Sequence, residues 1–169
     1  MESRTVEIGG IAMLIKSSME WNGDVIFKVF DEKTLKLKRQ FKQKNKVMDY
    51  ARSYLVSAMI AGDGSQTLYF PSKMELGTGT GTPLGNDTDL WNPVAGTMKQ
   101  CSNIQQYLTF YAQYVTTWLT TDPIQNTWTE IGLFDANGNL WAHSAITSNL
   151  TINSGEMLVA QWQVQIIGN

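Results

Sequence analysis

This sequence of 169 residues has one cysteine, one histidine, four prolines and few charged residues. The single cysteine, Cys101, excludes an intramolecular disulfide and a zinc site built from several cysteines. No stretch reaches the roughly 18 apolar residues of a membrane-spanning helix, so the sequence predicts no membrane contact. Residues 1–5 lack the apolar run and the cleavage site of a signal peptide. We therefore expect synthesis in a reducing cytoplasm.

The glycine-rich run at residues 77–82 lacks the chemistry of a nucleotide site. A P-loop ends in Lys followed by Ser or Thr, so that the ammonium reaches the phosphates, but Pro83 follows here. A dinucleotide fingerprint leads directly into a helix N-terminus, which this run does not predict. We interpret Gly77, Gly79 and Gly81 as structural glycines of a bend at a sheet edge, and we expect no cofactor.

Three polar residues after this run, Asn86, Asp87 and Asp89, carry oxygens of the kind that a hard cation prefers. An EF-hand loop beginning at Asp87 would need Gly at its sixth position and Glu at its twelfth, which are Asn92 and Met98 here. Short Asp side chains commonly accept hydrogen bonds from nearby backbone N–H groups instead. We expect such local caps and no metal site.

The sequence offers little to support catalysis. His143 is the only histidine, and no nucleophile-elbow motif accompanies it. Glu130 and Asp135 are the only acids of segment 129–140 and could be considered as a glycosidase pair. Glu130 is more simply explained as a partner of backbone or cross-strand groups, and Asp135 as the first residue of a turn. We predict that the chain is not an enzyme and that His143 packs in the interior or at an interface.

Charge is scarce, at 17% of residues, and unevenly distributed. Residues 1–52 hold eleven Lys and Arg and seven acids, a net charge of +4, whereas the remainder holds two bases and eight acids, a net charge of −6. Within residues 33–46 the basic residues alternate with Leu35, Leu37 and Phe41. Alternation is typical of the solvated face of a strand, which argues against nucleic-acid binding. Opposite charges on the two regions could orient neighbouring subunits.

Hydrophobic periodicity predicts one helix and several strands. Apolar residues recur at helical spacing over residues 46–61, after Asn45 as a candidate N-cap. Alternation over residues 157–167 predicts a half-buried strand, and Asn137-Gly138 predicts a hairpin turn with positive φ. Further strands are expected at residues 25–30, 35–41, 68–76 and 104–119.

The predicted fold is mainly β: an antiparallel β-sandwich of about eight strands with one α-helix, at about 46–61, that covers an edge or an end. The length suits a single domain over residues 1–169, in which residues 1–45 form a basic strand and hairpin region.

Two segments have a distinctive pattern: residues 76–90 read LGTGTGTPLGNDTDL, and residues 129–140 read TEIGLFDANGNL. Together they resemble structural proteins of tailed bacteriophages, above all the tail-collar and tail-fibre group. Residues 29–45, VFDEKTLKLKRQFKQKN, resemble a hairpin frequent in phage structural proteins, with Leu35 where that group usually has Gly. The resemblance covers residues 29–167. The sequence differs from the group's pattern at Trp91-Asn-Pro, and it lacks a long fibre shaft.

The resemblance implies a structural component of a phage virion: a tail, collar or baseplate building block, or a capsid decoration protein. Its partners would be further copies of itself and other virion proteins. The alternative is a receptor- or carbohydrate-binding module at the tail tip, whose tryptophans stack on host surface glycans. Aromatic residues and Met are enriched at protein interfaces. The candidate interface residues are Met48, Val56, Ile60, Trp91, Trp118, Trp128 and Trp141.

Overall fold

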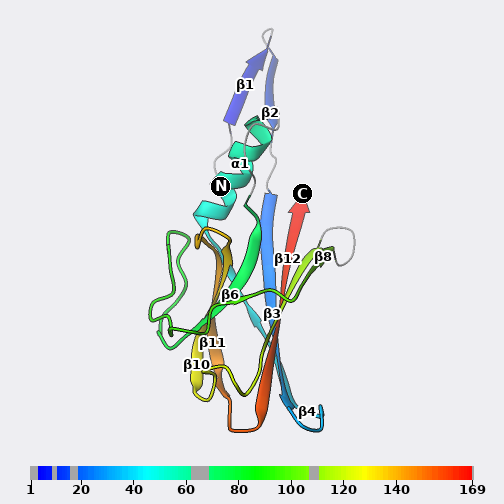
Figure 1. Ribbon diagram of the computed structural model, residues 1–169. Coiled ribbons are helices and arrows are strands. Elements are labelled where there is room, and N and C mark those ends of the chain that lie inside the picture. Colours follow the sequence, from blue (N-terminus) through cyan, green and yellow to red (C-terminus); the bar gives the residue numbers. More distant parts are fainter. Residues whose placement is uncertain (1–3, 9–10, 16–18, 62–68, 107–110, 169) are drawn as a thin grey trace.

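The computed structural model describes residues 4–8, 11–15, 19–61, 69–106 and 111–168, with side chains for residues 23–58, 69–106, 111–148 and 150–165. Two antiparallel five-stranded sheets face each other, and a two-stranded hairpin stands apart from them (Figure 1). The predicted mainly β sandwich with one helix is confirmed. No helix in these ranges is long and apolar enough to cross a membrane.

The strand order is β5-β11-β10-β6-β7 in the first sheet and β4-β3-β12-β9-β8 in the second. The first sheet consists of β5 (Lys46–Val47), β6 (Pro71–Gly77), β7 (Lys99–Gln100), β10 (Thr127–Asp135) and β11 (Leu140–Thr151). The second consists of β3 (Met19–Asp31), β4 (Leu37–Lys44), β8 (Asn103–Gln106), β9 (Tyr111–Trp118) and β12 (Glu156–Gly168). The separate hairpin is β1 (Arg4–Ile8) with β2 (Ile11–Ile15), and the helix is α1 (Asp49–Ala61). The described chain has more strands than the expected number of about eight, because the sequence patterns did not predict β1, β5 or β7 and joined β8 to β9.

The core lies between the two sheets and follows the alternation of the longest strands. Leu158, Ala160 and Trp162 of β12 are fully buried, as the sequence predicts, and each pairs with a buried residue of β3. On β4 the even-numbered lysines are exposed, whereas Phe41 stacks on Phe27 with ring centroids 4.9 Å apart. Period-2 patterning therefore sets which face of this sheet is covered.

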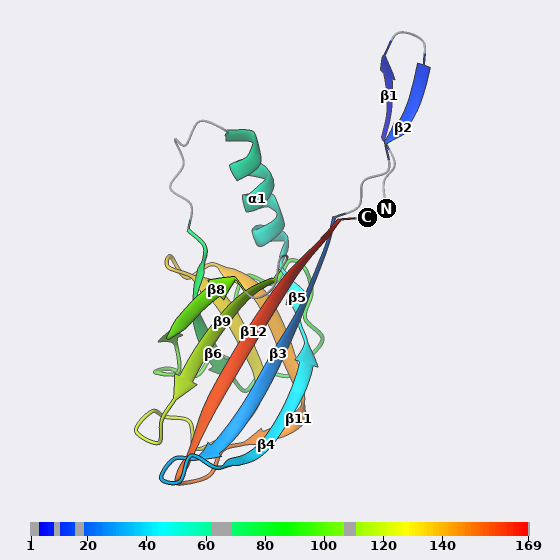
Figure 2. The same cartoon turned by 90° about the vertical axis from the view of Figure 1, so that its right-hand side faces the viewer.

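Helix α1 begins three residues later than predicted, and Asn45 is not its N-cap. Residues 46–47 instead form β5, which pairs with β11, and the N–H of Met48 donates to the carbonyl of Trp141 at 2.9 Å. Ala51 is buried against Trp141, which fixes the first turns of the helix at one end of the sandwich (Figure 2).

The strand predicted over residues 104–119 is wrong in part, because the described residues form two antiparallel strands. Ile104 of β8 pairs with Tyr114 of β9. The strand predicted at residues 68–76 begins at Pro71 in the structure. Proline is tolerated at the first position of a strand, where it removes no essential ladder hydrogen bond.

The turn of the β10–β11 hairpin differs from the predicted one. Gly138 has φ of +86°, but Asn137 is not in the positive-φ region, so the prediction that both residues have positive φ is wrong. The N–H of Gly138 donates to the carbonyl of Asp135 at 3.2 Å, and the N–H of Asp135 donates to the carbonyl of Asn139 at 3.1 Å. This three-residue loop with glycine in the left-handed region is the next most common hairpin connection.

The β3–β4 turn places a leucine where glycine is favoured. Leu35 has φ of +55° and is 66% exposed. Its N–H donates to the carbonyl of Asp31 at 2.8 Å, and the Asp31 carboxylate accepts the N–H of Thr34 at 2.9 Å. The turn is thus held by Asp31 although Leu35 is strained.

We predict that Leu35→Gly stabilises the protein by about 1 kcal/mol, because glycine adopts positive φ without the Cβ clash. Chemical denaturation with equilibrium fluorescence measures the change. Leu37→Gly is the matched control: it is also an exposed leucine, but it lies in β4, where glycine should destabilise by about 0.5–1 kcal/mol. If both variants shift the free energy of unfolding in the same direction, relief of strain at Leu35 does not explain the effect of Leu35→Gly.

Candidate functional site

A single buried carboxylate holds the loop of residues 78–98, which is far longer than the usual connection of about 2–6 residues. Glu130 of β10 is fully buried beneath this loop. Its Oε1 accepts the backbone N–H groups of Gly79 and Asn92, each at 2.8 Å, and its Oε2 accepts the N–H of Trp91 at 2.9 Å. The prediction that Glu130 satisfies backbone and cross-strand groups is confirmed.

The glycines of the predicted bend matter here because of their missing side chains. A Cβ at Gly77 or Gly79 would come within 2.4 or 2.5 Å of Oε1 of Glu130, closer than real contacts allow. Gly77 is the last residue of β6 and Gly81 lies in a bend. None of these three glycines has a positive φ. At Gly77 and Gly79, glycine is therefore needed for the close approach to Glu130 rather than for turn geometry, whereas a Cβ at Gly81 would lie 3.2 Å from the ring of Trp91.

His143 of β11 connects Glu130 to the loop from below. Its Nε2 lies 3.0 Å from Oε2 of Glu130, and its Nδ1 lies 3.1 Å from Oδ2 of Asp87. The ring of Trp91 covers the imidazole, with centroids 4.4 Å apart. With Glu130 and Asp87 both ionised, both contacts act as hydrogen bonds when each ring nitrogen carries a proton to donate, since a carboxylate can only accept. We call Glu130, His143 and Asp87 the Glu130 cluster.

The electrostatics of the Glu130 cluster fit a structural role. Burial raises the pKa of Glu130, but the hydrogen bond from His143 and those from the three backbone N–H groups outweigh it and hold the pKa below its ordinary value. Asp87 also accepts the N–H of Leu84 at 3.0 Å, and Asp89 accepts that of Leu90 at 2.8 Å, so the predicted local caps are confirmed. Within the described ranges, no group of three or more acidic, His or Cys side chains is arranged to hold a metal ion.

Asp135 organises the adjacent hairpin, as its predicted turn role requires. Its Oδ1 accepts the N–H groups of Asn137 and Asn139 at 2.9 and 3.0 Å. Its Oδ2 accepts the Tyr50 hydroxyl at 3.2 Å and lies 3.3 Å from Nε1 of Trp141. One buried carboxylate thus ties the turn to helix α1 and to Trp141.

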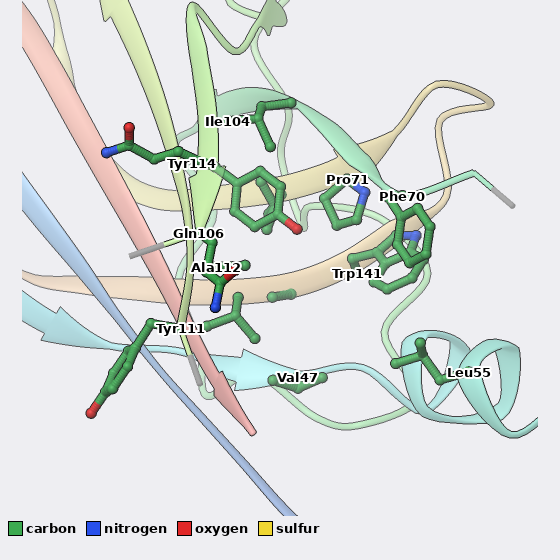
Figure 3. Close-up of a pocket in the computed structure, with 14 residues that line it drawn as sticks. Val47, Leu55, Phe70, Pro71, Ile104, Gln106, Tyr111, Ala112, Tyr114 and Trp141 are labelled. Carbon is green, nitrogen blue, oxygen red and sulfur yellow. The ribbon is translucent and has the colours of Figure 1, made fainter. Parts of the chain in front are cut away.

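An apolar cavity of about 580 Å³ opens between the two sheets at the end where α1 leaves the sandwich (Figure 3). Leu133 and Trp141 line it from the first sheet, and Tyr114 lines it from the second. Phe70 and Ile104 lie at its mouth and are about half exposed, at 49% and 50%. Burial, together with the nearby Cys101, raises the pKa of Tyr114 to about 12, so its phenol stays neutral near pH 7. The cavity therefore suits an apolar occupant.

Most of the candidate interface residues belong to the core instead. Met48, Trp118 and Trp128 are fully buried, and Trp141 is 5% exposed, so the prediction of an accessible interface is wrong for these four. The indole N–H groups of Trp118 and Trp128 donate to the carbonyls of Thr97 and Ile124 at 2.7 and 3.0 Å. These partners explain why the rings can be buried completely.

Three candidates differ from that group. Val56 is 56% exposed on α1, and Trp91 is half-buried over His143. The side chain of Ile60 lies outside the described part of the structure. Sequence reasoning did not identify the cavity, because Phe70, Ile104 and Tyr114 come from separate segments that only the fold brings together.

We predict that Glu130→Gln lowers the free energy of unfolding by about 2–4 kcal/mol. The amide keeps the shape of the side chain but removes the charge and places an N–H₂ group against a backbone donor. Glu75→Gln is the matched control on the neighbouring strand β6: burial, and then the charges of Asp89 and Glu130, raise the pKa of Glu75. Its charge opposes folding near pH 7, so this variant should be neutral or more stable.

The two variants should respond to pH in opposite senses. The depressed pKa of Glu130 contributes stability above its unfolded pKa that is lost as the pH falls, so the deficit of Glu130→Gln should shrink between about pH 7 and pH 3. The raised pKa of Glu75 gives a penalty that disappears in acid, so any gain in Glu75→Gln should also vanish there. Denaturation series at several pH values measure both trends. A Glu130→Gln deficit that does not change with pH would contradict the assignment.

The Glu130 cluster joins the two segments that resemble phage tail proteins. Residues 76–90 supply Gly79 and Asp87, and residues 129–140 supply Glu130. The residues that carry the resemblance thus include those that hold the loop in place. Comparisons with known proteins neither support nor contradict the resemblance. The chain matches no family model, no curated protein and no solved structure.

Proposed function

We propose that this chain is a structural component of a bacteriophage virion that acts through protein–protein assembly. Its place would be the tail, collar or baseplate, or the capsid surface as a decoration protein. The observation that carries the proposal is the apolar end of the sandwich, where the mouth of the cavity lies beside α1.

Several large apolar side chains are exposed at this end. Val56, Tyr69, Phe70 and Ile104 are each between 39% and 56% exposed. Phe70 lies over Trp141 with ring centroids 6.2 Å apart, so the exposed ring continues the buried aromatic cluster. Exposed apolar side chains gathered at one end of a protein are typical of protein–protein contact sites, and aromatic residues dominate the binding energy of such sites.

The buried state of the Glu130 cluster supports assembly over catalysis. Glu130 and His143 are both fully buried, and their polar atoms face each other, Asp87 and backbone N–H groups. A general acid or base must come within hydrogen-bond reach of its substrate. In the described conformation the loop of residues 78–98 occupies that position.

The burial of the tryptophans supports assembly over glycan binding as well. Three of the four tryptophans considered as stacking platforms, Trp118, Trp128 and Trp141, are in the core. A sugar platform needs an accessible ring face, which leaves Trp91 alone, and its ring packs on His143.

We predict that the purified protein binds saturably to virions assembled without it, and that Phe70→Asp weakens this binding at least about tenfold, because a buried charge replaces an aromatic contact. Sedimentation of particles with labelled protein measures the bound fraction. Leu84→Asp is the control, since Leu84 is also exposed, at 58%, but lies in the loop of residues 78–98.

Binding of wild-type protein to intact host cells, with none to the particles, would favour the receptor-binding alternative. Cryo-electron microscopy of the reconstituted particle then locates the subunit. An enclosed or tiled position agrees with the proposal, and a position at the distal tip with exposed tryptophan disagrees with it.

A further inference from the structure

The hairpin β1–β2 has no partner strand in the described chain. It forms a sheet of two strands, separate from both five-stranded sheets. Figure 2 shows it beyond the paired ends of β3 and β12, clear of the sandwich. A lone two-stranded hairpin is marginally stable in water at best, so this hairpin requires further contacts to persist.

The composition of the hairpin indicates what kind of contact it requires. All five residues of β2, Ile11-Ala-Met-Leu-Ile15, are apolar. The register places Val6 opposite Met13 and Ile8 opposite Ile11, and directly opposite residues share a face of an antiparallel pair. Apolar residues therefore gather on one face, and β2 is apolar on both. Strands that are apolar on both faces are normally covered on both faces.

The apolar cavity offers the complementary surface. Its mouth is lined by Ile104, Gln105 and Gln106 of β8, and all three are exposed. Strand β8 is the last strand of the second sheet and pairs on one side with β9. An edge strand presents backbone N–H and C=O groups that can pair with a strand from another chain. The apolar cavity and the edge strand of the second sheet, as far as the structure describes that sheet, thus lie together.

The route of the chain separates the hairpin from the cavity of its own subunit. Residues 19–21 of β3 pair with residues 166–168 of β12, beyond the points where β4 stops pairing with β3 at Asp24 and β9 stops pairing with β12 at Gln165. This two-stranded ribbon leads away from the sandwich, and the hairpin lies past its end (Figure 2). To reach its own cavity, the hairpin would have to bend back along the ribbon.

We propose that the hairpin β1–β2 of one copy docks in the apolar cavity of a neighbouring copy, along strand β8. The contact joins two different surfaces, so it repeats head to tail and closes a ring when the rotation between copies allows it. This inference rests on the assembly role proposed above and names the partner as a second copy of the chain.

Cysteine cross-linking of the full chain tests the contact. Cys101 is first replaced by Ser, and Met13→Cys and Ile104→Cys are then made in separate chains. Under mild oxidation, mixing the two should give a disulfide-linked dimer that neither chain gives alone. Met13→Cys mixed with Leu84→Cys is the control and should give none. A third chain carries both Met13→Cys and Ile104→Cys. If this chain cross-links within itself while the mixed single variants give no dimer, the hairpin docks in its own cavity and the proposal is overturned.

Light scattering gives an independent readout. Met13→Asp and Ile104→Asp should each raise the concentration needed for oligomers at least about tenfold, whereas Leu84→Asp should not. Unchanged thermal melting shows that the sandwich is intact in each variant. If Met13→Asp leaves the oligomers unaffected, or if the wild-type chain stays monomeric, the proposed docking of the hairpin in a neighbouring copy is overturned. A monomeric chain that still binds virions would contradict the hairpin docking but agree with the virion role. An oligomeric chain that binds no virions would contradict the virion role but agree with the hairpin docking.

Discussion

The hydrogen bonds of one buried carboxylate decide whether the loop of residues 78–98 has a structure. Glu130 accepts three backbone N–H groups, one from the start of this loop and two from its second half. It also faces His143, which contacts Asp87 near the middle of the loop. The loop in turn places Leu90 on Met48 and Phe134, and its Thr97 carbonyl accepts the indole N–H of Trp118. Without Glu130, these donors would be buried without partners, which is among the most destabilising changes available to a protein.

Much of the fold follows from local patterns in the sequence. Alternation in β12 predicts its buried face because a strand turns every second residue to the same side, and the apolar spacing of α1 predicts most of that helix. The start of α1 could not be predicted in this way. Residues 46–47 are helix-compatible, but pairing with β11 draws them into a sheet, and the choice depends on a strand about a hundred residues later. Tertiary pairing outweighs the weak local preference.

The candidate site was only partly predictable for a similar reason. The two segments that meet at Glu130 could be recognised, and so could the turn role of Asp135. The donors to Glu130 could not, because every residue except proline has a backbone N–H and nothing in Trp91 or Asn92 marks theirs. The aromatic content could not show which rings are core, since Trp118 and Phe70 are equally apolar. Their environments differ because Trp118 lies between the sheets and Phe70 at the mouth of the cavity.

The apolar cavity, the exposed ring at its mouth and the unpartnered hairpin lie at one end of the molecule, whereas the strained Leu35 lies at the other. At the end that holds the β3–β4 turn, charges are paired: Glu156 lies 2.8 Å from Arg39 and 3.3 Å from Lys38. At the opposite end lie the apolar cavity and the exposed Phe70, with the hairpin β1–β2 beyond them. Sequences that fold well satisfy local and global requirements together, and exceptions concentrate where function overrides stability. Because the cavity, the exposed Phe70 and strand β2 are apolar and lie at the same end, the proposed contact with another protein would account for them, whereas a reaction performed within the sandwich would not.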